Sequence, residues 1–185
     1  MAAFLIIPVS AVAQDARSID GVDPILLADA LKARAASPDA VENARYLSII
    51  DYRKPSGEPR YYLVDLETAT SQSLLVSHGK GSDPDHDGYA DVFSNTPGSK
   101  MSSLGAFVTG GRYVGQHGLS LRLIGLQPSN DQAEARAIVM HGANYVEPGR
   151  AILGRSWGCP ALSHSDVQRV IPMIEDGSFL YIVGE

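Results

Sequence analysis

One cysteine and five histidines are the residues with which this 185-residue chain could carry out nucleophilic chemistry. The cysteine, Cys159, lies in the segment GRSWGCPAL between Gly158 and Pro160, not in an apolar run. A thiol acts as a nucleophile when a nearby base withdraws its proton and backbone N–H groups stabilise the oxyanion on the attacked carbonyl. Gly158 permits the backbone dihedrals that point such groups at a substrate oxygen. The alternatives for a lone thiol are a buried hydrophobe, a metal ligand or half of an intermolecular disulfide.

Two histidines compete for the role of the base. His141 ends the apolar run AIVMHG and His78 ends the similar run SLLVSHG, so both rings are expected where a strand leaves the core. His117 is expected in a hairpin turn, and His86 and His164 in polar loops. Chemistry alone does not choose between His78 and His141.

The choice comes from a resemblance to a known family. His141-Gly142 followed by Arg155-Ser156-Trp157-Gly158-Cys159 is similar to the His-Gly and Ser-x-Gly-Cys signature of the L,D-transpeptidase catalytic domain, also called YkuD-like. Four further segments resemble the murein L,D-transpeptidase branch of that family: SHGKGSDPD, FSNTPGSKMSSLGAFVTG, HGLSLRLIGL and IVMHGANYV. The resemblance runs from Tyr46 to the C-terminus.

The resemblance implies that Cys159 attacks the amide between the L-centre and the D-centre of a peptidoglycan stem peptide. It assigns His141 as the general base and the carbonyl of Gly142 as the group that orients its ring. The N–H groups of Gly158 and Cys159 take the place of the oxyanion hole. The Cys159 sulfur should then lie within hydrogen-bond reach of a His141 ring nitrogen, or a little farther, with His78 more distant.

Four residues near the motif are predicted to contact the substrate: Arg155, Ser156, Trp157 and Asn144. Trp157 departs from the His or Arg that the family usually has there. Pro160 and Ala161 replace residues that in the family often include a substrate-binding Arg or Asn. The group that binds the substrate carboxylate is therefore open, and the candidates are Arg155, Arg122 and Arg150.

Short β-rich runs dominate the chain from Arg45 onward, which predicts a mainly β fold. With the resemblance, this indicates a single YkuD-like domain, sandwich-like or barrel-like, with a few short helices. Strands are expected in RYLSIIDY, RYYLVDLET, SQSLLVSHG, LGAFVTGG, RYVGQ, SLRLIGL, ARAIVMHGA and SFLYIVGE. Asp23-Pro24 predicts the start of one helix, and Ser163 or Ser165 the start of another that contains Pro172. The polar segment 79–103 is long enough to be a lid or a substrate loop.

The N-terminal residues 1–13 are predicted to be a signal-peptide remnant, because an apolar segment closes on Ala11-Val12-Ala13. Residues 14–44 form an N-terminal helical segment and residues 45–185 the catalytic domain. This organisation predicts an exported protein of the periplasm or cell envelope. No apolar run approaches the roughly 20 residues of a membrane-spanning helix.

The charge of the chain bears on its partners. A net charge of -6 with scattered basic residues argues against nucleic acid. The segment DPDHDGYAD opens like a calcium loop, but position twelve is Ser94 instead of the closing glutamate. No metal and no cofactor are predicted, and the oligomeric state is left open.

Three functions fit these residues. The leading one is a peptidoglycan L,D-transpeptidase, which passes the stem peptide from a Cys159 thioester to an amine. The second is an L,D-carboxypeptidase or endopeptidase, in which water takes the place of the amine. The third is a non-catalytic cell-wall-binding module, which loss of the base or of the oxyanion glycine would indicate. Neither residue is lost in this sequence.

Overall fold

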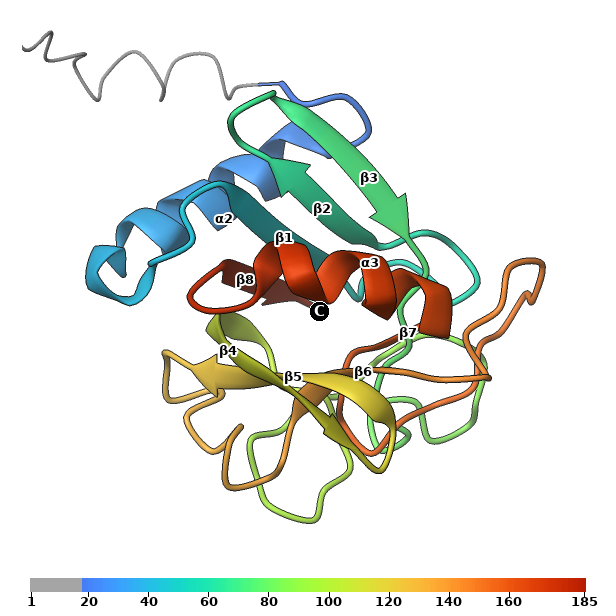
Figure 1. Ribbon diagram of the computed structural model, residues 1–185. Helices are drawn as coiled ribbons and strands as arrows, with labels where there is room; N and C mark the ends of the chain where they lie inside the picture. Colours follow the sequence, from blue (N-terminus) through green and yellow to red (C-terminus); the bar gives the residue numbers. More distant parts are fainter. Residues whose placement is uncertain (1–17) are drawn as a thin grey trace, which may run out of the picture.

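The computed structural model describes residues 18–185 and is built around one sheet of eight strands (Figure 1). The strands lie in the order β3-β2-β1-β8-β4-β5-β6-β7. Their bounds are β1 Tyr46–Asp51, β2 Tyr61–Asp65, β3 Thr70–Leu74, β4 Gly105–Gly115, β5 Gly118–Gly125, β6 Val139–Gly142, β7 Ala161–Leu162 and β8 Phe179–Val183. The helices are α2 Pro24–Ala35, the 3-10 turn η1 Pro38–Ala40 and α3 His164–Ile174. The prediction of a mainly β fold with a few short helices is confirmed.

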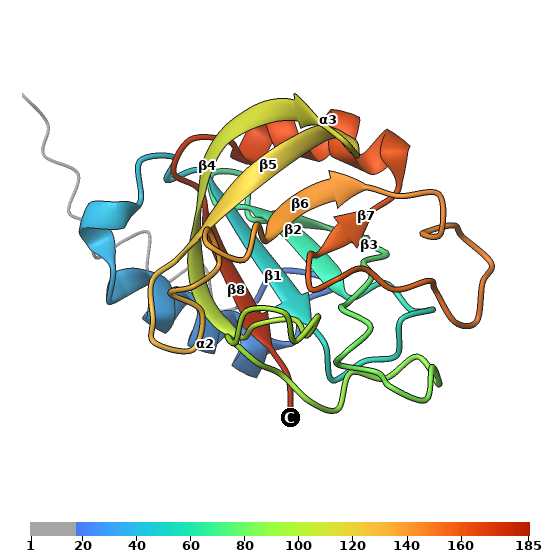
Figure 2. The same cartoon turned by 90° about the horizontal axis from the view of Figure 1, so that it is seen from below.

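The sheet curls until its two ends almost meet (Figure 2). β3 and β7 are the terminal strands of the sheet. Just after β3, the chain pairs with β7 through one antiparallel β-bridge, between Ser77 and Ala161. A strand was expected over SQSLLVSHG, but β3 ends at Leu74. The expectation was wrong for residues 75–79 because the chain there leaves β2 and crosses to β7. This crossing brings His78 beneath the cysteine motif, where Ser156 N donates to the carbonyl of His78 at 2.9 Å.

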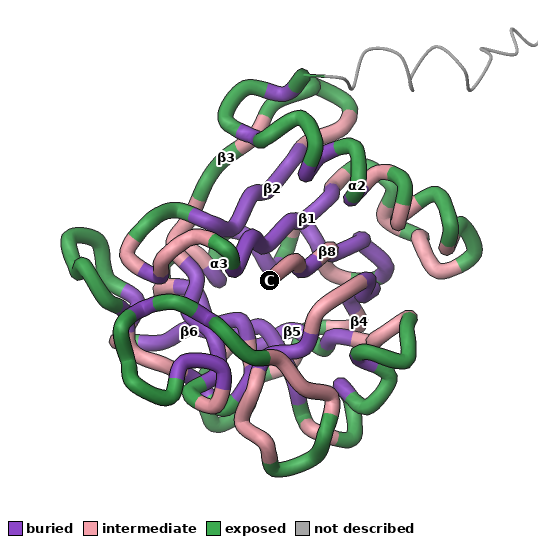
Figure 3. The backbone as a smooth tube through the Cα atoms, turned by 180° about the vertical axis from the view of Figure 1, so that it is seen from behind, coloured by how far each residue is buried: buried purple, intermediate pink, exposed green. Residues whose placement is uncertain are grey.

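The two faces of the sheet bury two separate apolar cores, which follows from the alternation of side chains along a strand. On β1, Ile50 points into the core on the concave side, where α3 contributes Val167, Val170, Ile171 and Ile174. Leu47 and Ile49 point to the other face and pack against Leu26, Leu27 and Ala30 of α2. Figure 3 shows the strands as mostly buried and the connecting loops as mostly exposed.

Both helix starts follow the sequence signals. The Asp23 carboxylate accepts hydrogen bonds from the N–H groups of Ile25 and Leu26, which caps α2. Ser163, not Ser165, caps α3 through the N–H of Asp166, and Pro172 lies inside the helix. None of the helices within residues 18–185 combines the length and the apolar character needed to cross a bilayer. The predicted signal remnant, residues 1–13, lies outside the described residues.

The β4–β5 hairpin carries His117 at its tip, as expected. The register shifts between Thr109 and Arg112, so that Gly110 and Gly111 form a bulge. Bulges bend a strand and increase its twist. β5 pairs in turn with β6, with Ser120 opposite His141. The hairpin therefore places His117 near the histidine that the sequence singles out.

Candidate active site

Cys159 lies just before β7 and is held against the strand that carries His141. β6 and β7 run parallel, with His141 opposite Ala161. The N–H of Val139 donates to the Cys159 sulfur at 3.5 Å, and the thiol donates to the carbonyl of Ala137 at 3.7 Å. The residue is half-buried. Burial raises the pKa of the Cys159 thiol above its ordinary value, against smaller opposite effects of the Val139 N–H and of Arg136. The thiol is therefore protonated at neutral pH.

His141 is a neutral base, and one of its ring nitrogens has no hydrogen-bond partner among residues 18–185. Its ring is almost fully buried, and burial lowers its pKa below the ordinary value. The charges of His117 and His164 lower the pKa further. Nδ1 lies 3.0 Å from the carbonyl oxygen of Gly142. Because a carbonyl only accepts, Nδ1 carries the proton and Nε2 keeps its lone pair. His117 stacks on the ring, with centroids 4.3 Å apart and an interplanar angle of 21°.

The structure contains no hydrogen bond between the Cys159 thiol and the His141 ring. The thiol donates to Ala137 instead. Direct hydrogen-bond contact, the closer of the two distances expected, is therefore not seen in this state. Catalytic hydrogen bonds are often long in substrate-free enzymes, so the looser form stays a prediction.

His78 is unavailable as a base because both of its ring nitrogens are occupied. Nδ1 lies 2.7 Å from a guanidinium nitrogen of Arg60, and Nε2 lies 3.0 Å from the Asp83 carboxylate. All three residues are fully buried. Burial, followed by the charge of Arg60, lowers the pKa of His78 to about 4. The sequence left two candidate bases, and the structure gives His78 a place in a buried network.

The loop before Cys159 is shaped by Ser156. Its hydroxyl donates to the carbonyl of Cys159 at 2.6 Å and accepts from the N–H of Gly158 at 3.1 Å. Gly158 has φ +123°, a region that favours glycine, and an added Cβ would lie 2.8 Å from the carbonyl oxygen of Met101. The N–H of Cys159 has no hydrogen-bond partner within residues 18–185. Of the two amides expected in the oxyanion hole, only that of Cys159 is unpaired in this structure.

The predicted substrate contacts lie in different environments. Ser156 is buried and uses its hydroxyl inside the loop, so in this state it offers nothing to a substrate. Arg155 donates to the backbone carbonyl of Asp83 and lies 3.8 Å from its carboxylate. Asn144 is exposed in the turn after β6. Trp157 is 70% exposed beside the cysteine, and the ammonium of Lys100 lies 4.5 Å from the centre of its ring.

Segment 79–103 packs against the loop that contains Gly158 and Cys159 (the cysteine loop), on the Cys159 side of the molecule, as expected. The hydroxyl of Ser102 accepts from the N–H of Gly79 at 3.0 Å and donates to the carbonyl of Gly158 at 3.2 Å. Lys100 has φ +58°, which is uncommon for a residue with a side chain. Opening of this segment as a lid stays a prediction.

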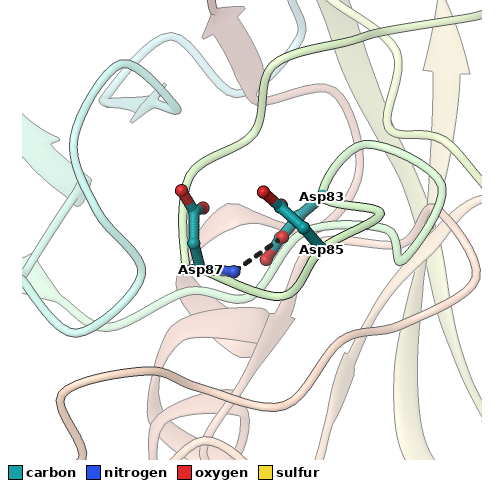
Figure 4. A group of neighbouring side chains, drawn as sticks. All are labelled: Asp83, Asp85 and Asp87. Carbon is teal, nitrogen blue, oxygen red and sulfur yellow. Dashed lines mark hydrogen bonds between the residues drawn. The ribbon is translucent and has the colours of Figure 1, made fainter.

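The acidic part of the segment gathers three carboxylates, Asp83, Asp85 and Asp87 (Figure 4). Their nearest ligand atoms lie within 4.8 Å of one another. Asp83 is buried and its carboxylate accepts from His78 and from the N–H groups of Asp87 and Gly88. Asp83 thus connects the loop to His78 and Arg155.

A family model described as the L,D-transpeptidase catalytic domain matches residues 19–183. The chain belongs to this family. The match begins before α2, farther toward the N-terminus than the resemblance from Tyr46 indicated. No curated protein matches the sequence.

Solved L,D-transpeptidases have the same fold at low sequence identity. An L,D-transpeptidase from Mycobacterium tuberculosis H37Rv aligns with a TM-score of 0.50 and 10% identity, over 76% of this chain and 58% of that chain. One from Mycobacterium smegmatis gives 0.48 and 11%, over 76% and 59%. One from Stackebrandtia nassauensis gives 0.45 and 14%, over 93% and 74%. The chain thus spans less than two thirds of the two mycobacterial structures.

Three features of the site were not found from the sequence. Lys100 is a single basic residue in a polar loop and Arg60 opens the run RYYLVDLET, and nothing in the sequence pairs them with Trp157 or His78. His117 was placed correctly in a hairpin turn, but its contact with His141 depends on the bend of β4 and on the pairing of β5 with β6. Tertiary packing, not local pattern, creates all three contacts.

Proposed function

We propose that this L,D-transpeptidase-family protein is a cysteine acyltransferase that acts on peptidoglycan stem peptides. The observation that carries the proposal is the state of His141: neutral, with Nδ1 fixed by the Gly142 carbonyl and Nε2 free, on the strand that holds the Cys159 sulfur. A neutral imidazole with a free nitrogen, on the strand that holds a protonated thiol, is the arrangement from which a base can generate a nucleophile once substrate binds.

In the first half-reaction, the Cys159 sulfur forms a bond to the stem-peptide carbonyl carbon while Nε2 of His141 takes the thiol proton. The N–H of Cys159, unpaired in the structure, stabilises the oxyanion of the tetrahedral intermediate. Collapse of this intermediate breaks the C–N bond, and His141 returns the proton to the departing amine. The product is a thioester on Cys159.

In the second half-reaction, an amine of another stem attacks the thioester carbonyl. A new C–N bond forms, the C–S bond breaks, and the amine proton passes through His141 to the thiolate. If water attacks instead, the product is a trimmed stem, which is the carboxypeptidase alternative. The predicted export places the protein in the periplasm or cell envelope, where both stems are available.

The test uses purified disaccharide tetrapeptide and follows release of its terminal residue. Cys159→Ser should lower turnover by about three orders of magnitude or more, because His141 deprotonates a hydroxyl far less easily than a thiol. EDTA should change turnover little. Turnover that survives Cys159→Ser, or that EDTA abolishes, would contradict the proposal. A wild-type protein that binds the stem without turnover would be the wall-binding module.

A further inference from the structure

A cavity of about 270 Å³ borders the strip of backbone that holds the nucleophile. One wall is formed by Ala137, Ile138 and Val139. The Cys159 sulfur contacts the two ends of this same strip, through the carbonyl of Ala137 and the N–H of Val139. Cys159 does not itself line the cavity, but a small group held against this strip would lie near the backbone atoms that hold its sulfur.

The remaining walls of the cavity bring charges of opposite sign. Arg122 of β5 and Glu134 of the β5–β6 connection both line it, together with Tyr113 of β4. The Arg122 guanidinium lies 4.7 Å from the centre of the Tyr113 ring and donates to the carbonyl of Gly111 at 3.4 Å. Within residues 18–185, neither Arg122 nor Glu134 takes part in an ion pair. Both charges remain available to a ligand.

The other two candidate arginines are already engaged. Arg155 is tied to Asp83. Arg150 forms an ion pair with Glu147, at 2.8 Å, in an exposed turn. Among residues 18–185, Arg122 is thus the candidate that combines a guanidinium outside any ion pair with a place in the cavity wall. The planar fork of a guanidinium matches a carboxylate well, and its position on the Tyr113 ring reduces the entropy lost on binding.

We propose that this cavity is the acceptor subsite and that it takes the head group of an α-amino acid, an amine with a neighbouring carboxylate. The inference rests on the proposed acyltransferase function. Arg122 binds the carboxylate, and Glu134 attracts the ammonium form from solution. The ammonium first gives one proton to solvent water. The resulting amine nitrogen attacks the thioester carbon, a second proton passes from it through Nε2 of His141 to the sulfur, and the C–S bond breaks.

The experiment compares two acceptors that differ only in the carboxylate. Disaccharide tetrapeptide is the donor, and a free D-amino acid or its carboxamide is the acceptor. Exchanged product and hydrolysed tripeptide are measured by mass spectrometry. The wild-type protein should use the acid about tenfold better than the amide or more, since loss of a charge-assisted bidentate contact has at least this effect on binding.

Two variants assign this preference to the cavity. Arg122→Gln should lower the ratio of exchange to hydrolysis about tenfold with the acid and much less with the amide. Arg150→Gln is the matched control, because Arg150 is exposed and paired with Glu147, and it should leave the ratio as in wild type. Glu134→Gln should raise the KM of the acceptor with the donor KM unchanged.

The outcomes separate the subsite from the enzyme. Equal use of acid and amide by the wild type, or an equal loss with both acceptors in Arg122→Gln, would overturn the subsite while acylation stands. If no acceptor reduces the amount of tripeptide formed, the subsite is also overturned while acylation stands. Absence of any acyl-enzyme or released terminal residue would overturn the proposed function and the subsite together.

Discussion

At the scale of the residue, His141 owes its properties to its neighbours. The Gly142 carbonyl fixes the tautomer, and burial with the nearby charges of His117 and His164 lowers the pKa of the ring. His117 contributes twice, because it covers the ring and because its own charge opposes protonation of His141.

Removing His117 should therefore raise the pKa of His141. The acid limb of the profile of kcat/KM against pH reports the base of the free enzyme, so in His117→Ala it should move to higher pH. His86→Ala is the control, because His86 lies near Leu153, where Nε2 donates to the carbonyl, and not at His141. An acid limb that stays in place, or moves to lower pH, would show that His117 does not act on the base.

Trp157 is the residue where this chain departs most visibly from the family signature. It is highly exposed and has Lys100 over its ring. We expect this pair to contact the donor stem, with the ring as a flat surface and the ammonium facing a carboxylate. Trp157→Ala should raise the donor KM about fivefold to tenfold with a smaller change in kcat. Tyr89→Ala, which removes an exposed aromatic elsewhere in the segment, should change neither constant. A loss confined to kcat would contradict a binding role.

At the scale of the element, the site depends on the contact between segment 79–103 and the cysteine loop. Gly79 lies at this contact, since an added Cβ would lie 2.8 Å from the Cα of Gly158, and 2.4 Å from the carbonyl oxygen of Lys100 in its own segment. Both obstacles are backbone atoms, so relief requires the backbone at residue 79 to move away from Gly158 and from Lys100.

Gly79→Ala should destabilise the protein by about 1–3 kcal/mol and lower activity more than the stability loss explains. Gly111→Ala is the control, because the nearest atom to its added Cβ is a side-chain oxygen of Asp176 at 3.6 Å. Thermal unfolding and turnover at a temperature where both variants are folded give the comparison. Full activity in Gly79→Ala would mean that the contact does not position Cys159.

Elements with a local signal were predictable, and elements made by distant pairing were not. Asp23 and Ser163 cap α2 and α3 as their positions indicate, and Gln116-His117 turn the hairpin. The insertion of β8 between β1 and β4 pairs residues far apart in the chain, such as Leu47 with Phe179 and Gly105 with Ile182, for which the sequence has no periodic signal. In the same way, the motif identified Cys159 and His141 by resemblance, whereas the Arg122 cavity required the pairing of β5 with β6.

At the scale of the whole molecule, the buried side chains of Arg60, His78 and Asp83 form a network that connects segment 79–103 to the core. Arg60 also donates to the carbonyls of Val76 and Lys54, and its guanidinium carbon lies 4.9 Å from the centre of the Tyr52 ring. The network holds the start of segment 79–103 in place. Its histidine makes folding sensitive to pH.

The pKa of His78 in the folded protein, about 4, lies below the ordinary histidine value of 6.5. Above pH 6.5, His78 is neutral in both states and its contribution to stability is complete. As the pH falls toward 4, the unfolded chain binds a proton that the folded chain excludes, so stability is lost. The melting temperature should fall across this window, with His141 acting in the same direction.

His78→Leu should lower stability by about 3 kcal/mol at pH 7, because it leaves buried charged groups without a partner. It should also make the melting temperature less dependent on pH between 6.5 and 4. If the melting temperature changes with pH as steeply in the variant as in the wild type, His78 does not control this dependence.

Intact-protein mass spectrometry after acid quenching tests whether Cys159 carries the stem peptide as a thioester. With disaccharide tetrapeptide, the wild-type protein should gain the mass of the donor less its leaving residue. Peptide mapping should place the adduct on Cys159, hydroxylamine should remove it, and Cys159→Ala should show none. A wild-type protein that turns over substrate without such an adduct, or an adduct that persists in Cys159→Ala, would contradict the account.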